Sequence, residues 1–124
     1  MRMSLHERLK RFTYTAQGFR IAWIEESSFR FHIMCALFTL LCAYVLQVSK
    51  TEFLIVIIMI GFVVVAELFN TALEELCDKF QPTHDPHVAK IKDLAAAAVF
   101  ASAITAVLVG LAIFIPRIIN VFAV

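Results

Sequence analysis

The sequence predicts an all-α membrane protein: an N-terminal amphipathic helix on the membrane surface, then three transmembrane helices, in one domain (residues 1–124). The chain is 61% hydrophobic and its mean hydropathy is +0.85, well above the values typical of soluble domains. Three long apolar stretches follow one another, at about residues 31–48, 53–80 and 90–115. Residues 1–28, in contrast, alternate basic, aromatic and polar side chains. Together these observations exclude an ordinary soluble fold.

The first predicted element is a surface helix over residues 1–28, with Gly18 as the place where we expect any break. A stretch of this composition suits the boundary between lipid and water, although on its own it would also suit a soluble helical hairpin. It has no continuous apolar core, so we do not interpret it as a signal peptide. Its apolar side is supplied by Met3, Leu5, Leu9, Phe12, Phe19 and Trp23, and its basic side by Arg2, Arg8, Lys10, Arg11 and Arg20.

Three spans complete the predicted fold. The first (31–48) is just long enough to cross a bilayer, and a polar turn at 49–52 follows it. The second starts at Phe53 and carries no charge through Ala66, after which it continues as helix to residue 80. A loop at 81–90 contains two prolines, and the third span then runs to residue 115, where Pro116 predicts a break.

The uneven distribution of basic residues predicts the orientation. Residues 1–30 hold six Lys and Arg, the first loop one, the second loop with its flanks three, and the tail one. By the positive-inside rule, the N-terminus and the second loop are cytoplasmic. The net charge of only +1 gives no reason to expect a nucleic-acid partner. Small residues in the first half of the third span favour close helix packing and self-association in the membrane.

A polar stripe at the end of the second span is the main candidate for chemistry. Glu67, Asn70, Glu74 and Asp78 are spaced by three, four and four residues, which keeps them on one side of a helix. Ionisable groups at membrane depth are costly and usually have a function. We expect Glu67 to be a general base for an alcohol at the membrane boundary. The alternative is a structural carboxyl that is hydrogen-bonded to Asn70 or to a neighbouring helix.

Two further pairs could serve a nucleotide. Glu26 and Glu74 are candidate oxygen ligands for Mg²⁺, which typically takes one or two carboxylates and completes its shell with phosphates and water. Taken alone, Glu26 would more simply be a solvated residue beside another glutamate. Lys92 could hold a phosphate as a point charge, and with Asp93 it could equally be an ordinary interfacial cap.

Other polar side chains carry no recognisable motif. The cysteines (Cys35, Cys42 and Cys77) form no C-x-x-C pair and are expected to act as small hydrophobes. The histidines at 32, 84 and 87 are not at metal-ligand spacing, so we expect surface polar roles for them. Three glycines are too few for a P-loop, so a nucleotide would be held by carboxylates, metal and basic side chains on helices.

Three blocks resemble one family. Residues 67–78 (ELFNTALEELCD) resemble the E-x-x-N-[ST]-A-[IL]-E-x-x-x-D signature of the prokaryotic diacylglycerol kinase and undecaprenol kinase family. Residues 92–99 (KDLAAAAV) are similar to its K-D-x-[AG]-[AS]-x-A-V block, and residues 18–30 to its G-x-R-x-A-W-x-x-E-x-x-F-R block. The blocks occur in the family's order and cover almost the whole chain.

The resemblance implies an enzyme of the prokaryotic cytoplasmic (inner) membrane. Three membrane helices and an interfacial helix per chain would assemble as a homotrimer, with active sites shared between subunits near the cytoplasmic surface. Such enzymes transfer the γ-phosphoryl group of Mg-ATP to a lipid hydroxyl. The implied partners are therefore ATP, Mg²⁺ and a membrane lipid alcohol.

The resemblance also implies residue roles. Glu67 corresponds to the general base, with Asn70 beside it, and Glu26 and Glu74 correspond to the metal ligands. Nucleotide contacts are assigned to Tyr14, Glu26, Glu74, Lys92 and Asp93, and lipid contacts to Arg20, Trp23, Arg30 and Glu67. The family's N-terminal arginine has no clear match, because Glu7 takes its position and Arg8 is next to it. The 81–90 loop matches poorly, so its histidines receive no role.

The acceptor stays open between undecaprenol and diacylglycerol. Residues 29–32 (FRFH) resemble the F-R-x-H of the Gram-positive branch, which slightly favours a polyprenol. The competing functional class is a non-enzymatic membrane protein, an ion-conducting or assembly subunit that uses the acidic stripe for ions.

Overall fold

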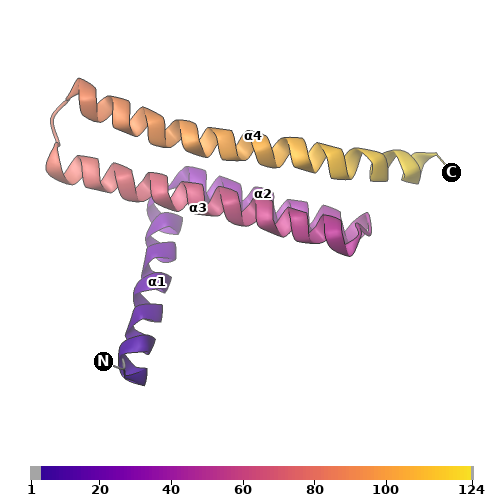
Figure 1. The fold of residues 1–124 in the computed structure, drawn as a ribbon, viewed down its shortest axis with the longest axis horizontal. Helices are drawn as coiled ribbons and strands as arrows, with labels where there is room; N and C mark the ends of the chain where they lie inside the picture. The colour runs from indigo at the N-terminus through magenta and orange to yellow at the C-terminus, as the bar shows by residue number, and fades with distance from the viewer. Residues whose placement is uncertain (1–3, 124) are drawn as a thin grey trace.

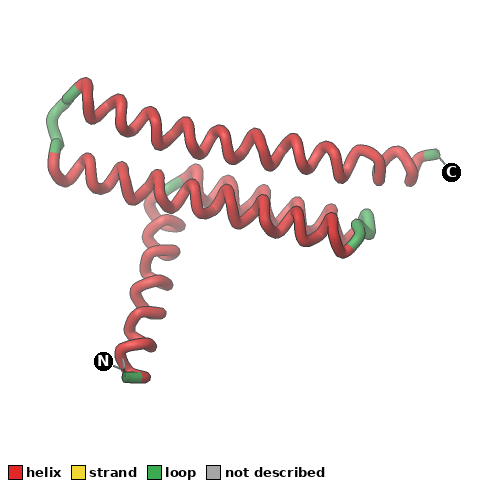
Figure 2. The backbone as a smooth tube through the Cα atoms, viewed as in Figure 1, coloured by secondary structure: helices red, strands yellow, loops and turns green. Residues whose placement is uncertain are grey.

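A computed structural model describes residues 4–123, and all of their regular structure is helical (Figures 1 and 2). The helices are α1 (Leu5–Glu25), α2 (Ser27–Val45), α3 (Lys50–Phe80) and α4 (Pro86–Phe122). The three later helices run side by side, whereas α1 points away from them (Figure 1). Arg2 and Met3, which the sequence assigned to the surface helix, lie outside the described residues.

Local interactions at its two ends define α1. Ser4 and Glu7 form a capping box at its start, each side chain accepting from the other's backbone N–H. Glu26 is extended, which ends the helix, and Nη1 of Arg30 donates to the carbonyls of Trp23 and Ile24 at 2.7 and 3.0 Å. The expected break near Gly18 is absent and α1 is continuous there. A lone glycine costs a helix only about 1 kcal/mol, too little to stop it.

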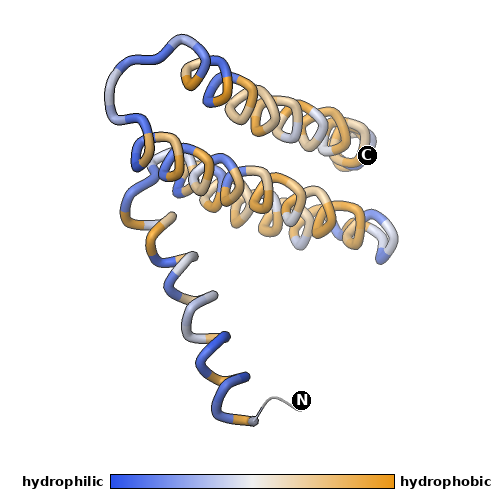
Figure 3. The backbone as a smooth tube through the Cα atoms, turned by 60° about the vertical axis from the view of Figure 1, so that its left-hand side comes forward, coloured by the Kyte–Doolittle hydropathy of each residue, from blue (hydrophilic) through white to orange (hydrophobic). Residues whose placement is uncertain are grey.

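Helices α2, α3 and α4 are each long and apolar enough to cross a membrane. They contain 19, 31 and 37 residues, which at about 1.5 Å per residue gives lengths of roughly 28, 46 and 55 Å. A bilayer core is about 30 Å thick, so α2 barely spans it while α3 and α4 extend past it. In Figure 3 the middle of these helices is hydrophobic and the α3–α4 loop is hydrophilic.

Helix α3 is central, with α4 packed along one side and α2 along another. The side chains buried at these contacts recur at heptad spacing and are mostly small, whereas the large apolar side chains point outward. Outward apolar faces are expected where lipid is the surrounding solvent. The buried positions include Ala36 and Ala43 on α2, Val56 and Val63 on α3, and Ala95 and Ser102 on α4.

Helix α4 differs from its predicted bounds at both ends. It begins at Pro86 rather than near residue 90, because Asp85 caps it and proline is favoured in a first turn. The loop is therefore only residues 81–85. The predicted break at Pro116 is also wrong, because the helix continues to Phe122. Proline removes one backbone donor, and transmembrane helices tolerate this loss.

The α2–α3 turn is tightly held. Gln47 has φ of 49° in the left-handed region, and the N–H of Val48 donates to the carbonyl of Ala43, as in a Schellman motif. Arg117 of α4 reaches this turn: Nη1 donates to the Gln47 carbonyl at 3.2 Å and Nη2 pairs with Oε2 of Glu52 at 2.6 Å. We call Gln47, Glu52 and Arg117 the turn clasp.

Candidate active site

Glu67 is the most deeply buried carboxylate of the described residues, with 1% of its surface exposed. Both of its oxygens face α2. The Ser28 hydroxyl donates to Oε2 at 3.1 Å, and Nε2 of His32 lies 3.1 Å from Oε1. The His32 contact is at ion-pair distance but lacks the alignment of a hydrogen bond, so Oε1 has no hydrogen-bond partner within residues 4–123. The expectation of a surface role for His32 was wrong.

Further along the stripe, the side-chain amide of Asn70 forms a hydrogen bond with Glu74 rather than with Glu67. Its Nδ2 donates to Oε1 of Glu74 at 3.3 Å, one helical turn away. Its Oδ1 and the Thr71 hydroxyl are buried without a hydrogen-bond partner in the part of the chain described. Buried polar atoms are almost always paired, so these two call for a partner outside the described residues, such as water, a ligand or another chain.

Glu26 brings a third carboxylate to this end of α3. It is the extended residue between α1 and α2, and it is only partly exposed. Burial raises the pKa of its carboxyl, and the negative charges of Glu74 and then Glu67 raise this pKa further. Three carboxylates from two separate parts of the sequence therefore share one electrostatic neighbourhood, as the metal assignment requires of Glu26 and Glu74.

The basic and aromatic residues that the resemblance assigned to nucleotide and lipid contacts form no hydrogen bond or ion pair with the three carboxylates in the described residues. Nζ of Lys92 donates to Oδ1 of Asp78 at 2.9 Å, which joins α4 to the end of the stripe, and Asp93 is exposed beside it. Tyr14 is 12 residues before Glu26, about 18 Å along a helix that points away from the others (Figure 1). Arg20 and Trp23 are exposed on the same helix. Within residues 4–123, no hydrogen bond or ion pair joins these three side chains to Glu26, Glu67 or Glu74.

Arg30 has a visible structural function. Its guanidinium satisfies carbonyls in the last turn of α1, which has no basic residue of its own there. It thereby fixes the junction that carries Glu26. The structure gives no contact between Arg30 and the carboxylate cluster.

Distances along α3 indicate how deep each carboxylate lies in the membrane. Glu67 lies 15 residues after Glu52 and Glu74 lies 22 after it, or about 22 and 33 Å along the helix. A hydrocarbon core about 30 Å thick that begins at Glu52 therefore encloses Glu67 and ends near Glu74. Glu67 can meet a lipid while Glu74 meets water.

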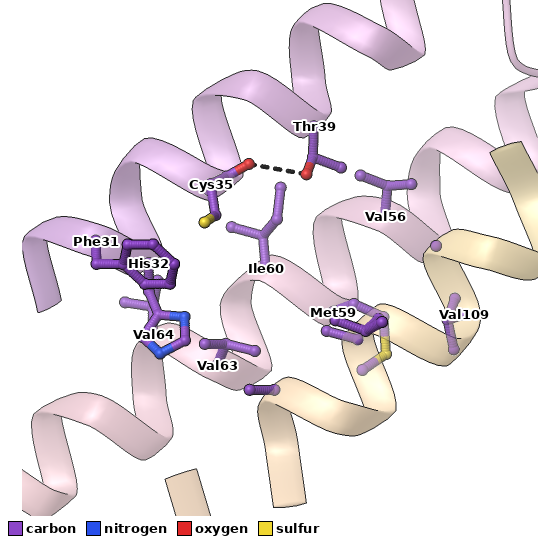
Figure 4. Close-up of a pocket in the computed structure, with 15 residues that line it drawn as sticks. Phe31, His32, Cys35, Thr39, Val56, Met59, Ile60, Val63, Val64 and Val109 are labelled. Carbon is purple, nitrogen blue, oxygen red and sulfur yellow. Dashed lines mark hydrogen bonds between the residues drawn. The ribbon is translucent and has the colours of Figure 1, made fainter. Parts of the chain in front are cut away.

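An apolar groove of about 340 Å³ lies one turn before Glu67 on α3 (Figure 4). All three long helices contribute to it. His32 stands at the end of the groove nearest Glu67, with its ring directed toward Val63 and Val64 in Figure 4, and Thr39 lies toward the other end. The Thr39 hydroxyl donates to the Cys35 carbonyl, so little free polarity faces the groove. A hydrocarbon chain fits such a lining.

The donors suit a magnesium nucleotide better than a free metal ion. No three His, Cys, Asp or Glu side chains within residues 4–123 converge as metal ligands. Glu26 and Glu74 supply two carboxylates, and Mg²⁺ bound with a nucleotide needs no more, because phosphates and water fill the other positions. The pKa of Glu26 is raised first by burial and then by the negative charges of Glu74 and Glu67.

Sequence reasoning missed the two α2 side chains that contact Glu67. Ser28 and His32 are four residues apart, so they share one face of α2. This spacing was visible in the sequence, but nothing local joined it to a carboxylate about 40 positions away. The start of α4 could have been found, because Asp85 followed by Pro86 is a recognisable N-cap signal.

Comparisons with known proteins place the chain in a family. Residues 13–114 match the family model of prokaryotic diacylglycerol kinase. The undecaprenol kinase of Bacillus subtilis (strain 168) is 33% identical over 116 residues, which cover 94% of each chain. The diacylglycerol kinase of Escherichia coli (strain K12) is 30% identical over 95 residues, 77% of this chain and 78% of that protein. That of Helicobacter pylori (strain ATCC 700392 / 26695) is 36% identical over 85 residues, 68% and 66% of the two.

Proposed function

Because the chain belongs to the prokaryotic diacylglycerol kinase family, we propose that it phosphorylates the hydroxyl of a membrane lipid alcohol, undecaprenol or diacylglycerol, with ATP as donor. The observation that carries this proposal is the position of Glu67. Its carboxylate is buried one turn beyond an apolar groove. This depth suits a lipid hydroxyl, and Glu74 lies further along α3 toward water.

Glu67 acts as the general base. It accepts the proton of the lipid hydroxyl while the new oxygen–phosphorus bond forms, and the bond between the β–γ bridging oxygen and the γ-phosphorus breaks to release ADP. A positioned base typically contributes about 10²- to 10⁴-fold in rate. Phosphoryl transfer otherwise depends on positioning and charge stabilisation, which side chains on rigid helices can provide. The side-chain N–H of Asn70 donates to Glu74 and so orients that carboxylate, while Oδ1 of Asn70 stays free for a ligand.

Glu26 and Glu74 are the proposed holders of the magnesium ion that accompanies ATP. The ion would supply charge neutralisation at the phosphates. Lys92 and Asp93 lie at the start of α4 on the same side of the molecule as the end of the stripe, as the Lys92–Asp78 pair shows. We assign both to the nucleotide, with Lys92 exchanging Asp78 for phosphate oxygens.

The assembly is proposed to be a homotrimer, with the N-terminus and the α3–α4 loop in the cytoplasm. The orientation follows from the basic residues near these segments. The direction of α1 supports self-association, because this helix points away from the other three helices of its own chain and leaves Tyr14, Arg20 and Trp23 exposed. Unpaired polar atoms at Asn70 and Thr71 support it as well. In this arrangement α1 lies in the membrane interface.

The acceptor's hydrocarbon is proposed to occupy the groove, with its hydroxyl at the His32 end. Arg20, Trp23 and Arg30 are assigned to the lipid near its polar end. The match to the undecaprenol kinase of Bacillus subtilis extends over 94% of both chains, whereas the matches to the diacylglycerol kinases cover less. This difference favours undecaprenol, and both lipids present one primary hydroxyl.

Phosphate transfer from labelled ATP tests the proposal directly. The purified full chain in mixed micelles would receive undecaprenol, diacylglycerol or ceramide as separate acceptors, with and without Mg²⁺. We expect labelled undecaprenyl phosphate or phosphatidic acid only when Mg²⁺ is present. No labelled product from any of these lipids, or from a total lipid extract, would refute the kinase and favour an ion-conducting or assembly subunit.

A further inference from the structure

Both contacts to Glu67 come from one turn of α2. The Ser28 hydroxyl donates to Oε2, and Nε2 of His32 stands at Oε1, each at 3.1 Å. The final torsion of a glutamate side chain is broad, so an uncontacted carboxylate can rotate. Contacts on both oxygens from one rigid helix restrict that rotation.

His32 also lies between Glu67 and the groove. It lines the groove and its side chain is 20% exposed, whereas Glu67 is 1% exposed and does not line the groove. A ligand that fills the groove therefore meets the imidazole first. The imidazole both lines the groove and contacts the proposed base.

We propose that Ser28 and His32 are positioning residues, which hold the Glu67 carboxylate in the orientation that receives the proton of the acceptor. The inference rests on the proposed lipid kinase activity. Ser28 anchors one oxygen by a formed hydrogen bond. His32 holds the other through a contact that tightens when the acceptor seats against the ring, since catalytic hydrogen bonds are often poorly aligned before substrate binds.

Four variants test the roles of Ser28 and His32, with kcat and KM for ATP measured separately. His32→Phe keeps a ring but removes the donor, and His32→Gln restores an N–H group. Ser28→Ala removes the other donor and Ser28→Thr keeps it. A misplacement of about 1 Å can lower a rate on the order of 100-fold, so we expect His32→Phe to lower kcat by roughly 10- to 100-fold with KM for ATP unchanged. The kcat of His32→Gln should be much closer to wild type than that of His32→Phe. In the same way, the kcat of Ser28→Thr should be much closer to wild type than that of Ser28→Ala.

His87→Gln is the matched control, because it makes the same substitution at an exposed histidine outside the site. It should keep wild-type kcat. A double variant supplies the second readout: if His32 acts through Glu67, His32→Phe should have no further effect on kcat in a Glu67→Gln background.

The outcomes separate this inference from the proposed function. Wild-type protein without kinase activity refutes the function. Active wild-type protein with normal kcat in His32→Phe and Ser28→Ala refutes the positioning pair, and so does His32→Gln that is no better than His32→Phe. Should His32→Phe fail to fold, Ser28→Ala against Ser28→Thr decides in its place. A full multiplicative loss in the Glu67→Gln background would show that His32 does not act through Glu67.

Discussion

The carboxylates near the two ends of α3 differ in whether a basic side chain pairs with them. At the α2–α3 turn, Glu52 closes the capping box with Ser49 and pairs with Arg117, which also satisfies the Gln47 carbonyl. At the other end, Glu67 shares its neighbourhood with Glu26 and Glu74 and meets no Lys or Arg at ion-pair distance within the described residues. The first arrangement closes the fold, and the second leaves Glu67 and Glu26 without a Lys or Arg partner among the described residues, although Lys92 pairs with Asp78 further along the stripe.

This difference distinguishes carboxylates that stabilise the fold from carboxylates that serve a function. A paired carboxylate at a turn stabilises the hairpin in every state of the protein. Unpaired carboxylates and buried oxygens without partners lower stability, and they persist where a ligand supplies what is missing. The cluster at Glu67 is therefore compatible with the proposed cation and phosphate, whereas the turn clasp has no such requirement.

The largest expected effect is that of Glu67→Gln. The amide keeps the shape and can still accept from Ser28, but it cannot take a proton. We expect turnover to fall by about 10²-fold or more while the melting temperature in detergent stays within a few degrees of wild type. Initial rates of lipid phosphate formation and a thermal melt of the same preparation measure the two quantities. Near-normal turnover would contradict the base assignment.

Arg117→Ala should have a smaller effect of the opposite kind. It removes the contacts to Glu52 and to the Gln47 carbonyl, so we expect a lower melting temperature with kcat nearly unchanged. The double variant with Glu52→Ala should lose less than the sum of the single variants, because the two side chains share one interaction. A large loss of kcat with an unchanged melting temperature would remove the distinction between the two ends of α3.

The smallest expected effect concerns the cap of α4. Backbone N–H groups of Val88 and then His87 hold the pKa of Asp85 below its ordinary value. A folded pKa below the unfolded value gives a stabilisation that is present above the unfolded pKa, about 3.9, and disappears as the pH falls through the folded pKa. We therefore expect Asp85→Ala to speed amide exchange at His87 and Val88 at neutral pH, with the difference from wild type shrinking below about pH 4.

Asp85→Asn is the control for this experiment, because asparagine caps a helix without titrating in that range. Its amide protection should show no acid-dependent loss. Exchange at these amides that does not differ between wild type and Asp85→Ala at neutral pH would show that Asp85 does not stabilise the start of α4.

The spans and the acidic stripe could be predicted because they follow from local patterns. Apolar length predicts the three long helices, and spacing places Glu67, Asn70 and Glu74 on one side of α3. The break assigned to Pro116 shows where such rules fail. An isolated proline ends many helices, but α4 is supported by its packing on α3 and by the Arg117 contacts on the turn, so it continues.

The sequence by itself determined the class of protein, the depth of Glu67 in its helix and the family blocks, because hydropathy, helical periodicity and motif spacing are properties of neighbouring residues. Only the tertiary structure decided which side chains meet. It brought Ser28 and His32 to Glu67 and Arg117 to Glu52, and it directed α1 away from the other three helices. The physical reason is that these contacts depend on how α2 and α4 pack against α3, and no pattern along a single helix specifies the residue that lies opposite.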